Sequence, residues 1–187
     1  MSVFSNRGSN TQPSPCRMNP EPTKSPLPYT DTKPVGAADF YFAINATFKF
    51  IEAKRDREGL QRYWQDLGRN YYAPVTAAWK RDGLRAVAEY WRAFFKAEPG
   101  GDVEVIDSDQ NVVLDVRVCP AIKHLRANGR EILPCFCQHC YFVTDAMAAP
   151  VGFTVRIEGG NGACRQTITP INPALPPQNL AHIKEAK

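Results

Sequence analysis

The chain has 187 residues, 43% of them hydrophobic, and its 23 basic and 19 acidic residues give a formal net charge of +4. This length is enough for one hydrophobic core, so we expect a single domain with tails. The charges are interleaved, as in residues 54–58, which argues against nucleic-acid binding. The sequence has neither an apolar run of about 20 residues nor a secretory signal, so we expect no membrane span and a cytoplasmic location.

Proline-rich segments flank the expected domain. Residues 1–37 contain seven of the 16 prolines and almost no apolar periodicity, which is typical of an extended arm. Residues 170–187 have a similar composition and are expected to form a C-terminal tail. The single domain should therefore span residues 38–169. We expect one or both proline-rich segments to contact a protein partner or a second copy of the chain.

Apolar residues recur at helical spacing in the first part of the domain. The spacing predicts two amphipathic helices, over residues 40–51 and 60–71, that meet at Gly59. A third helix can start at Pro74, and residues 84–95 give the strongest helical pattern. The aromatic side chains in these stripes could line a ligand pocket, but packing in the core explains them without a ligand. We therefore favour core packing.

Hydrophobic residues then alternate with a period of two. Residues 103–106 and 112–118 predict a β-hairpin with one buried face. Residues 153–157 and 164–169 predict a second hairpin, joined by the glycine-rich turn at residues 159–162.

Two shorter helices are expected between these hairpins. Pro120 fits the first position of a helix over residues 121–128, so Cys119 is a candidate N-cap, where the positive end of the helix favours a thiolate. Pro134 can begin a second helix that runs to about Ala148. We therefore expect an α+β fold, in which N-terminal helices precede an antiparallel sheet of two hairpins with two helices inserted between them.

Five of the six cysteines fall within 46 residues, which indicates metal binding or reactive thiols in a reducing compartment. The alternative is that they are small buried side chains of the core. Cys137 and Cys140 lie three residues apart on one helical face, so their sulfurs can converge. Cys119 and Cys164, from two strand ends, could complete a four-ligand site for zinc or, as a second choice, for an iron–sulfur cluster.

His139 lies between the two helical cysteines. It could replace one of them as a metal ligand or act as a general base, and a hydrogen-bonded or surface histidine is an equal alternative. The sequence from Cys137 to Cys140 also resembles the active motif of disulfide oxidoreductases. A thioredoxin fold needs that motif early in the chain, whereas here it follows four helices and a hairpin, so we disfavour this interpretation.

From about Phe40 to Thr169, the order of elements and cysteines resembles the L-2-amino-thiazoline-4-carboxylic acid hydrolase family. The matching residues are Cys119-Pro120, the region from Cys137 to Cys140 with Thr144-Asp145-Ala146 after it, and Cys164. That family is similar to the 4-vinyl reductase ligand-binding domains, whose sensor members hold zinc beside an aromatic-lined pocket. The resemblance implies that Cys119 corresponds to the first cysteine ligand, Cys137 to the acidic ligand, Cys140 to the next cysteine and Cys164 to the last. The chain departs from the hydrolase motif because Cys140 stands where that motif has an Asp.

The resemblance implies hydrolysis of a C–N bond in a small cyclic amidine. Cys119 or a metal-bound water would attack the ring carbon, and His139 or Asp145 would move protons. The alternative is a non-catalytic accessory subunit of a larger enzyme complex, which binds zinc or an iron–sulfur cluster through the four cysteines. A third interpretation is a small-molecule sensor that uses the aromatic helices as its pocket.

Overall fold

The computed structural model describes residues 36–187, and these residues have the α+β fold that the sequence predicts. Two long helices, α1 (Phe40–Asp66) and α2 (Ala73–Ala97), precede the sheet. Two short helices, α3 (Pro120–Ala127) and α4 (Gln138–Ala148), lie between its hairpins in the sequence. The predicted arm over residues 1–37 falls almost entirely outside the described residues.

Each of the long helices contains a break. In α1 the break falls at Asp56, whose φ is 59° and whose Oδ1 accepts a hydrogen bond of 2.9 Å from the backbone N–H of Gly59. The expected junction at Gly59 is therefore three residues too late, because the side chain of Asp56 caps the segment that follows. In α2 the break falls at Gly83, whose φ of 65° is a conformation that glycine adopts at little cost.

Five strands form one mixed sheet in the order β1-β2-β4-β3-β5. Strands β1 (Asp102–Asp107), β2 (Val112–Val118), β4 (Ala163–Pro170) and β3 (Phe153–Gly160) pair antiparallel in that order. The fifth strand, β5 (Ile183–Lys184), pairs parallel with the end of β3. The expectation of a purely antiparallel sheet of two hairpins therefore needs correction, because a strand of two residues has no periodic pattern to detect.

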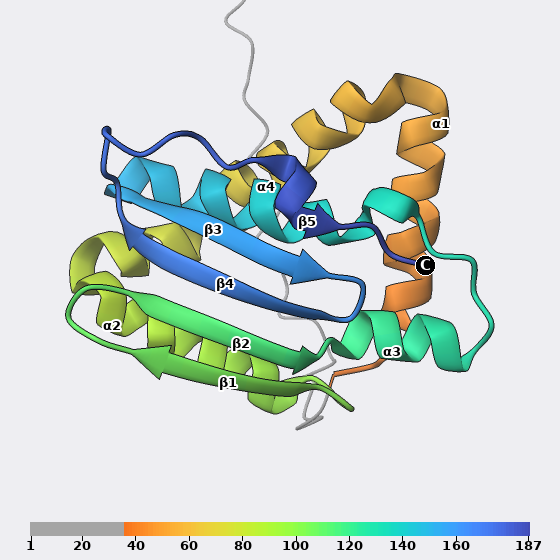
Figure 1. Ribbon diagram of the computed structural model, residues 1–187, viewed down its shortest axis with the longest axis horizontal. Coiled ribbons are helices and arrows are strands. Elements are labelled where there is room, and N and C mark those ends of the chain that lie inside the picture. Colours follow the sequence, from red (N-terminus) through yellow and green to blue (C-terminus); the bar gives the residue numbers. More distant parts are fainter. Residues whose placement is uncertain (1–35) are drawn as a thin grey trace, which may run out of the picture. The chain divides into compact units, whose positions relative to one another are not determined.

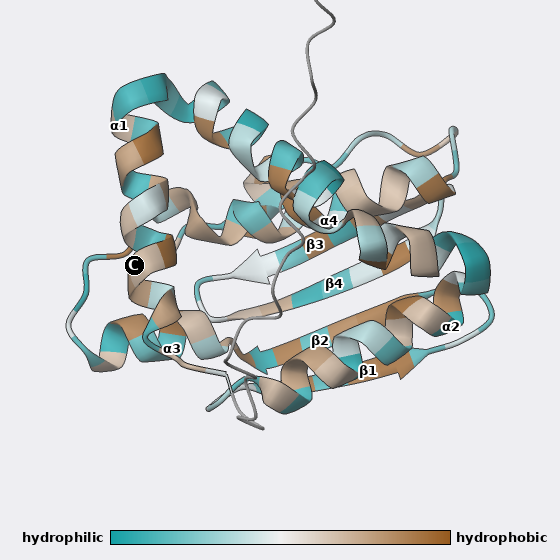
Figure 2. Cartoon of the chain, turned by 180° about the vertical axis from the view of Figure 1, so that it is seen from behind, coloured by the Kyte–Doolittle hydropathy of each residue, from teal (hydrophilic) through white to brown (hydrophobic). Residues whose placement is uncertain are grey.

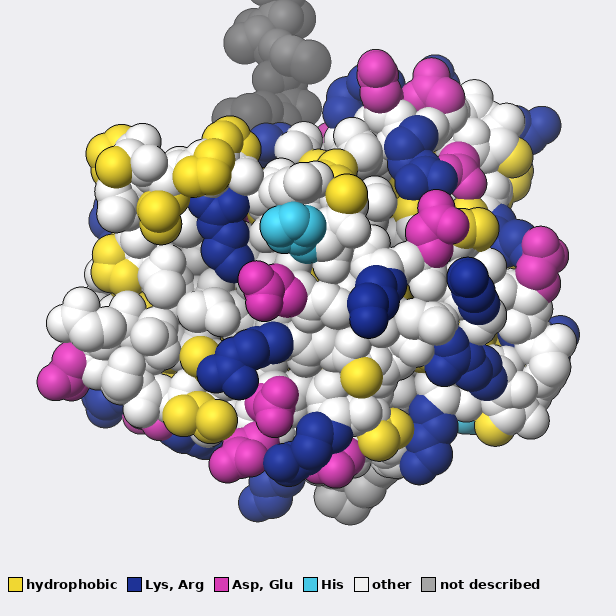
Figure 3. All heavy atoms as spheres, viewed as in Figure 1, with side chains coloured by type: hydrophobic (Ala, Val, Ile, Leu, Met, Phe, Trp, Pro, Cys, Tyr) yellow, Lys and Arg dark blue, Asp and Glu magenta, His cyan; other side chains and the backbone are white. Residues whose placement is uncertain are grey.

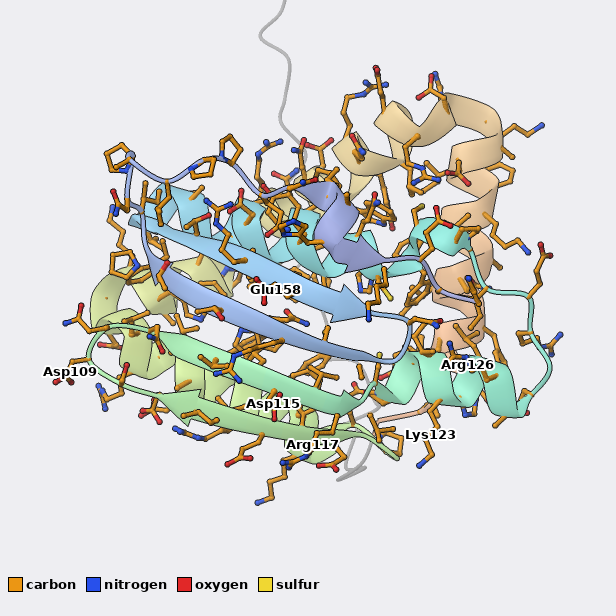
Figure 4. The ribbon with its side chains drawn as sticks, viewed as in Figure 1. Asp109, Asp115, Arg117, Lys123, Arg126 and Glu158 are labelled. Atoms are coloured by element: carbon orange, nitrogen blue, oxygen red, sulfur yellow. The ribbon has the colours of Figure 1, made fainter. Side chains whose placement is uncertain are left out.

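The helices α2 and α4 cover one face of the sheet, as the views from the two sides show (Figure 1, Figure 2). Val112, Leu114 and Val116 of β2 are buried, as predicted for one face, although Val113 of the opposite face is buried as well. On the opposite face, Asp115, Arg117 and other charged side chains point to solvent, with acidic and basic groups interspersed (Figure 3, Figure 4). The hydrophobic core therefore lies between the helices and the sheet.

The end of α1 comes very close to α4. Gly68, in the π-helical turn that follows α1, is buried, and a Cβ atom there would lie 2.5 Å from the carbonyl oxygen of Val143 and 2.8 Å from Cβ of Ala146. Only a glycine leaves room for this approach. This close contact positions α4, which carries Cys140.

Residues 170–187, expected to be a separate tail, pack along the edge of β3 and belong to the same compact unit as the domain. The side chain of Gln178 accepts from the N–H of Ile157 at 3.0 Å and donates to its carbonyl at 3.1 Å, as a neighbouring strand would. Ile183 and Ala186 are each only 3% exposed. The described C-terminal segment therefore covers an edge of its own sheet.

Within residues 36–187, no helix has the length and the apolar character needed to cross a membrane.

Candidate functional site

A cavity of about 320 Å³ lies between the helical layer and the sheet. Its walls come from α1, α2, α4 and the ends of the strands. Aromatic residues contribute much of the lining, among them Tyr41, Tyr63, Tyr72, Tyr90, Trp91 and Phe95. Trp64 and Trp79, in contrast, are fully buried in the core. Some aromatic residues of the predicted helical stripes thus line the cavity and others pack in the core, although core packing alone was the favoured prediction.

The lining of the cavity is uncharged. Among residues 36–187, no Lys, Arg, Asp or Glu side chain contributes to it. A charged group that enters such an environment loses its hydration and gains no ion pair, which is strongly unfavourable. The cavity is therefore suited to a neutral molecule with a largely apolar surface.

Cys119 occupies the predicted N-cap position of α3 and lines the cavity. Its backbone N–H donates to the carbonyl of Gly162 at 2.8 Å, which ties the start of α3 to the β3–β4 turn. Burial raises the pKa of the Cys119 thiol to about 11, although the nearby backbone N–H groups of Ile122 and Ala121 act in the opposite direction. The expected stabilisation of a thiolate by the helix is therefore present but smaller than the cost of burial.

Cys137, Cys140 and Cys164 line the same cavity. The sulfur of Cys137 accepts a hydrogen bond of 3.3 Å from the N–H of Asn161, and that of Cys164 accepts one of 3.6 Å from Nε2 of Gln166. Burial raises the pKa of Cys140 to about 11 and the pKa values of Cys137 and Cys164 to about 12. All of these groups are therefore neutral thiols near pH 7.

The β3–β4 turn holds this end of the cavity together. The turn residue Asn161 contacts Cys137, and its backbone carbonyl accepts a hydrogen bond of 3.1 Å from Arg126 of α3 (Figure 4). The C-terminal residue Lys187 donates its N–H to Oδ1 of Asn161 at 2.8 Å. A Cβ atom at Gly160 would lie 2.5 Å from the carbonyl oxygen of Lys184, so glycine is needed where β5 approaches. The C-terminal segment therefore supports the wall that carries the thiols.

His139 also lines the cavity, but its ring packs among the aromatic rings of Phe48, Trp64 and Phe136. Its Nδ1 donates to the carbonyl of Phe136 at 2.6 Å, and burial lowers the pKa of the imidazole. The sulfur of Cys140 lies 3.9 Å from Nδ1 and 3.7 Å from Nε2. Such similar distances place the sulfur beside the Cε1 edge or over the ring, and not in line with the lone pair of a base.

Asp145, the third predicted catalytic residue, does not reach this cavity. Its Oδ1 accepts a hydrogen bond of 2.9 Å from Oγ1 of Thr154 and one of 3.4 Å from the N–H of Val155. It lies instead beside a second, smaller hollow of about 190 Å³ that Arg69 and Tyr141 also line. The structure therefore brings Cys119 and His139 to one cavity and leaves Asp145 as a residue that attaches β3 to α4.

All four predicted metal ligands line one cavity, and all five cysteines of the described part of the chain are free thiols. Within that part, however, no three side chains of His, Cys, Asp or Glu are arranged as a group that could hold a metal ion. The arrangement therefore does not form a ready coordination shell of the kind that zinc requires.

Two polar residues of the site were not predicted as functional. Gln166 is 5% exposed and donates to Cys164, and its position on the buried face of a strand was the one available signal. Tyr41 lines the cavity and donates its hydroxyl hydrogen to the carboxylate of Glu98, 57 residues away in the sequence. No local pattern indicates such a long-range pair.

Comparison with models of known protein families, with curated proteins and with solved structures finds no match to this chain. The resemblance to the thiazoline-carboxylate hydrolase family therefore stays a prediction.

Proposed function

We propose that residues 36–187 form a small-molecule-binding domain whose cavity holds a neutral, largely apolar ligand against four thiols. The observation that carries this proposal is the composition of the lining, which combines aromatic residues with Cys119, Cys137, Cys140 and Cys164. Aromatic rings and thiols both offer polarisable, weakly hydrated surfaces, which favour contact with an apolar ring. A cytoplasmic location would keep these thiols reduced.

A binding experiment with indole, a neutral aromatic probe, tests this proposal. Titration calorimetry would compare the wild-type protein with Ile44→Trp, which places a larger side chain in the lining. The same substitution at Ile106, which is 43% exposed on β1 and lies outside the lining, is the matched control. We expect indole to bind the wild type and Ile106→Trp with similar affinity and to bind Ile44→Trp at least tenfold more weakly. Equal affinities for all of them would contradict the proposal.

The charge of the ligand gives a second test. Indole-2-carboxylate has the same ring system with an added negative charge, and the lining offers this charge no Lys or Arg side chain within the described residues. We expect it to bind at least a hundredfold more weakly than indole, because the desolvation of the carboxylate is not compensated. A carboxylate that binds as tightly as indole would contradict the assignment of a neutral ligand.

A second proposal is hydrolysis of a C–N bond in a small cyclic amidine, as the family resemblance implies. The observation that favours it is the position of Cys119, which lines the cavity and whose sulfur lies beside the first N–H groups of α3. The Cys119 thiol would add its sulfur to the amidine carbon and its proton to nitrogen, and the C–N bond would break. A water molecule would then add to the same carbon, break the C–S bond, release the product and restore the thiol. Because the lining is uncharged, the substrate form that it suits is a neutral amidine without a carboxylate substituent and without the proton that most amidines carry at pH 7.

The pKa of Cys119 sets the pH dependence of such a reaction. With a pKa of about 11, only roughly one molecule in ten thousand carries the thiolate at pH 7, so the rate should rise about tenfold per pH unit toward pH 11. Cys119→Ser should abolish hydrolysis and leave the fold intact. A variant that retains the wild-type rate would contradict a nucleophilic role for this residue.

Metal binding in an accessory subunit is a separate proposal. Its support is that all four candidate ligands, from three different parts of the sequence, line one cavity. Metal analysis and an absorption spectrum of protein purified without oxygen would test it. Stoichiometric zinc or visible iron–sulfur bands would support this proposal, and the absence of both metals would contradict it.

A further inference from the structure

One polar group of the cavity has an unusual partner. The hydroxyl of Tyr41, in the first turn of α1, donates to the carboxylate of Glu98, the residue that follows α2. Tyr41 lines the cavity, whereas Glu98 does not. The carboxylate, which is not part of the lining, thus fixes the orientation of the phenol.

This hydrogen bond determines what the phenol can offer to a ligand. A tyrosine hydroxyl has one hydrogen to donate and lone pairs that accept. Because the hydrogen of Tyr41 is donated to Glu98, only the lone pairs remain available on the oxygen. A hydrogen bond to a carboxylate also polarises the hydroxyl and makes its oxygen a better acceptor. The hydroxyl oxygen of Tyr41 can therefore accept a hydrogen bond from a ligand but cannot donate one.

The surroundings of this oxygen strengthen the same preference. Burial and the carboxylate of Glu98 raise the pKa of Tyr41, so the phenol keeps its hydrogen at neutral pH. Burial is also the main cause that raises the pKa of Tyr72, and the nearby carboxylate of Glu98 adds to it. This corner of the cavity is therefore close to a negative charge and adjoins the thiols, so an additional acceptor or an anion would be repelled.

We propose that the Tyr41–Glu98 pair makes the cavity selective for a ring ligand that carries an N–H or O–H donor, such as an azole or a phenol. This inference rests on the proposed binding of a neutral, apolar ligand and adds the polar group by which the ligand is recognised. A site built around a hydrogen bond discriminates strongly against an analogue that lacks the partner group, because the buried group of the protein is then left unpaired.

Indole and 1-methylindole form a matched pair of probes, because they differ only in the replacement of the N–H hydrogen by a methyl group. Titration calorimetry with the wild type should give a dissociation constant for indole about tenfold lower than for 1-methylindole. In Tyr41→Phe the preference should disappear, with similar dissociation constants for the two probes. Tyr71→Phe, which removes a phenol hydroxyl from an exposed residue outside the lining, is the control and should keep the tenfold preference.

A second variant removes the carboxylate that accepts the hydrogen bond of Tyr41. In Glu98→Ala the hydroxyl hydrogen of Tyr41 is no longer donated to a carboxylate. The oxygen is then no longer held as an acceptor, so the preference for indole should fall although Tyr41 is unchanged. Circular dichroism and thermal unfolding would verify that each variant is folded, and Glu98→Ala decides the question if Tyr41→Phe is not folded. A full tenfold preference in either folded variant would overturn the inference.

The outcomes separate this inference from the proposed function. If both probes bind the wild type equally and Ile44→Trp weakens both, the cavity binds apolar rings and the selectivity of the Tyr41–Glu98 pair is refuted. If neither probe binds the wild type, the proposed function is refuted, and the inference falls with it.

Discussion

Removal of the Cys140 thiol should make the stability of the protein less sensitive to alkaline pH. Burial raises the pKa of this thiol from 9.0 to about 11, so the folded state favours the protonated form more than the unfolded chain does. The resulting stabilisation is complete below pH 9 and is lost as the pH rises toward 11. Cys140→Ala lacks this titrating group and should lose less stability over that range.

The size of the effect follows from the two pKa values. At pH 10 the ionised form outnumbers the thiol about tenfold in the unfolded chain, whereas in the folded protein it is about a tenth as abundant as the thiol. Ionisation of this one group therefore lowers the free energy of unfolding by about 1.4 kcal/mol between pH 7.5 and pH 10. Cys140 also raises the pKa values of Cys119, Cys137 and Cys164. Its removal therefore lowers these pKa values in the folded state, which further reduces the loss of stability at alkaline pH.

Urea unfolding followed by tryptophan fluorescence, with a reductant and a chelator present, would measure the effect at pH 7.5 and pH 10. The wild type should lose about 1.4 kcal/mol more than Cys140→Ala between these pH values. Val143→Ala, one turn further along α4 and also in the cavity lining, removes volume without a titrating group and should show the wild-type pH dependence. An identical pH dependence in Cys140→Ala and the wild type would refute the reasoning.

Three further substitutions test how the site is supported. Gly68→Ala should cost about 1–3 kcal/mol of unfolding free energy, because its Cβ would overlap the carbonyl of Val143, and undiminished stability in urea would contradict the close approach. Ile183→Ala should cost about 2 kcal/mol and speed the labelling of Cys137 by a thiol reagent; an unchanged rate would show that the C-terminal segment does not protect that wall. Asp145→Ala should cost about 1–2 kcal/mol and leave indole affinity unchanged, whereas a tenfold loss of affinity at unchanged stability would place Asp145 in the site.

Periodicity was sufficient to predict the elements that pack against the core. The alternation at Val112, Leu114 and Val116 gave the correct buried face of β2, because one face of this strand packs on helices. The helix boundaries were less accurate where a side chain decides them. Asp56 breaks α1 by capping the next segment, whereas Gly59, the residue with the stronger tendency to interrupt a helix, lies within it.

The C-terminal segment shows why composition alone was insufficient. Its prolines are typical of an extended tail, and the segment is indeed mostly irregular between Pro170 and Gln178. Its attachment depends on single contacts, such as the amide of Gln178 on β3 and the buried side chain of Ile183. These contacts join residues that are more than 20 positions apart, and no local pattern records them.

For the site, the sequence supplied the residue types but not their surroundings. The spacing of Cys137 and Cys140 and the Pro that follows Cys119 place these thiols at helix starts, which local rules can predict. The enclosure of His139 by three aromatic rings and the use of Asp145 to hold β3 depend on tertiary packing. A titratable side chain beside a cysteine motif is therefore an incomplete guide to catalysis.

The position of a bound ligand tests the central claim most directly. In a crystal of the protein soaked with 5-bromoindole, the anomalous signal of bromine would locate the ring without reference to any variant. We predict a bromine peak inside the cavity lined by Tyr41, Trp91 and Cys140. A peak confined to the charged face of the sheet or to the hollow beside Asp145, with none in the cavity, would contradict the account.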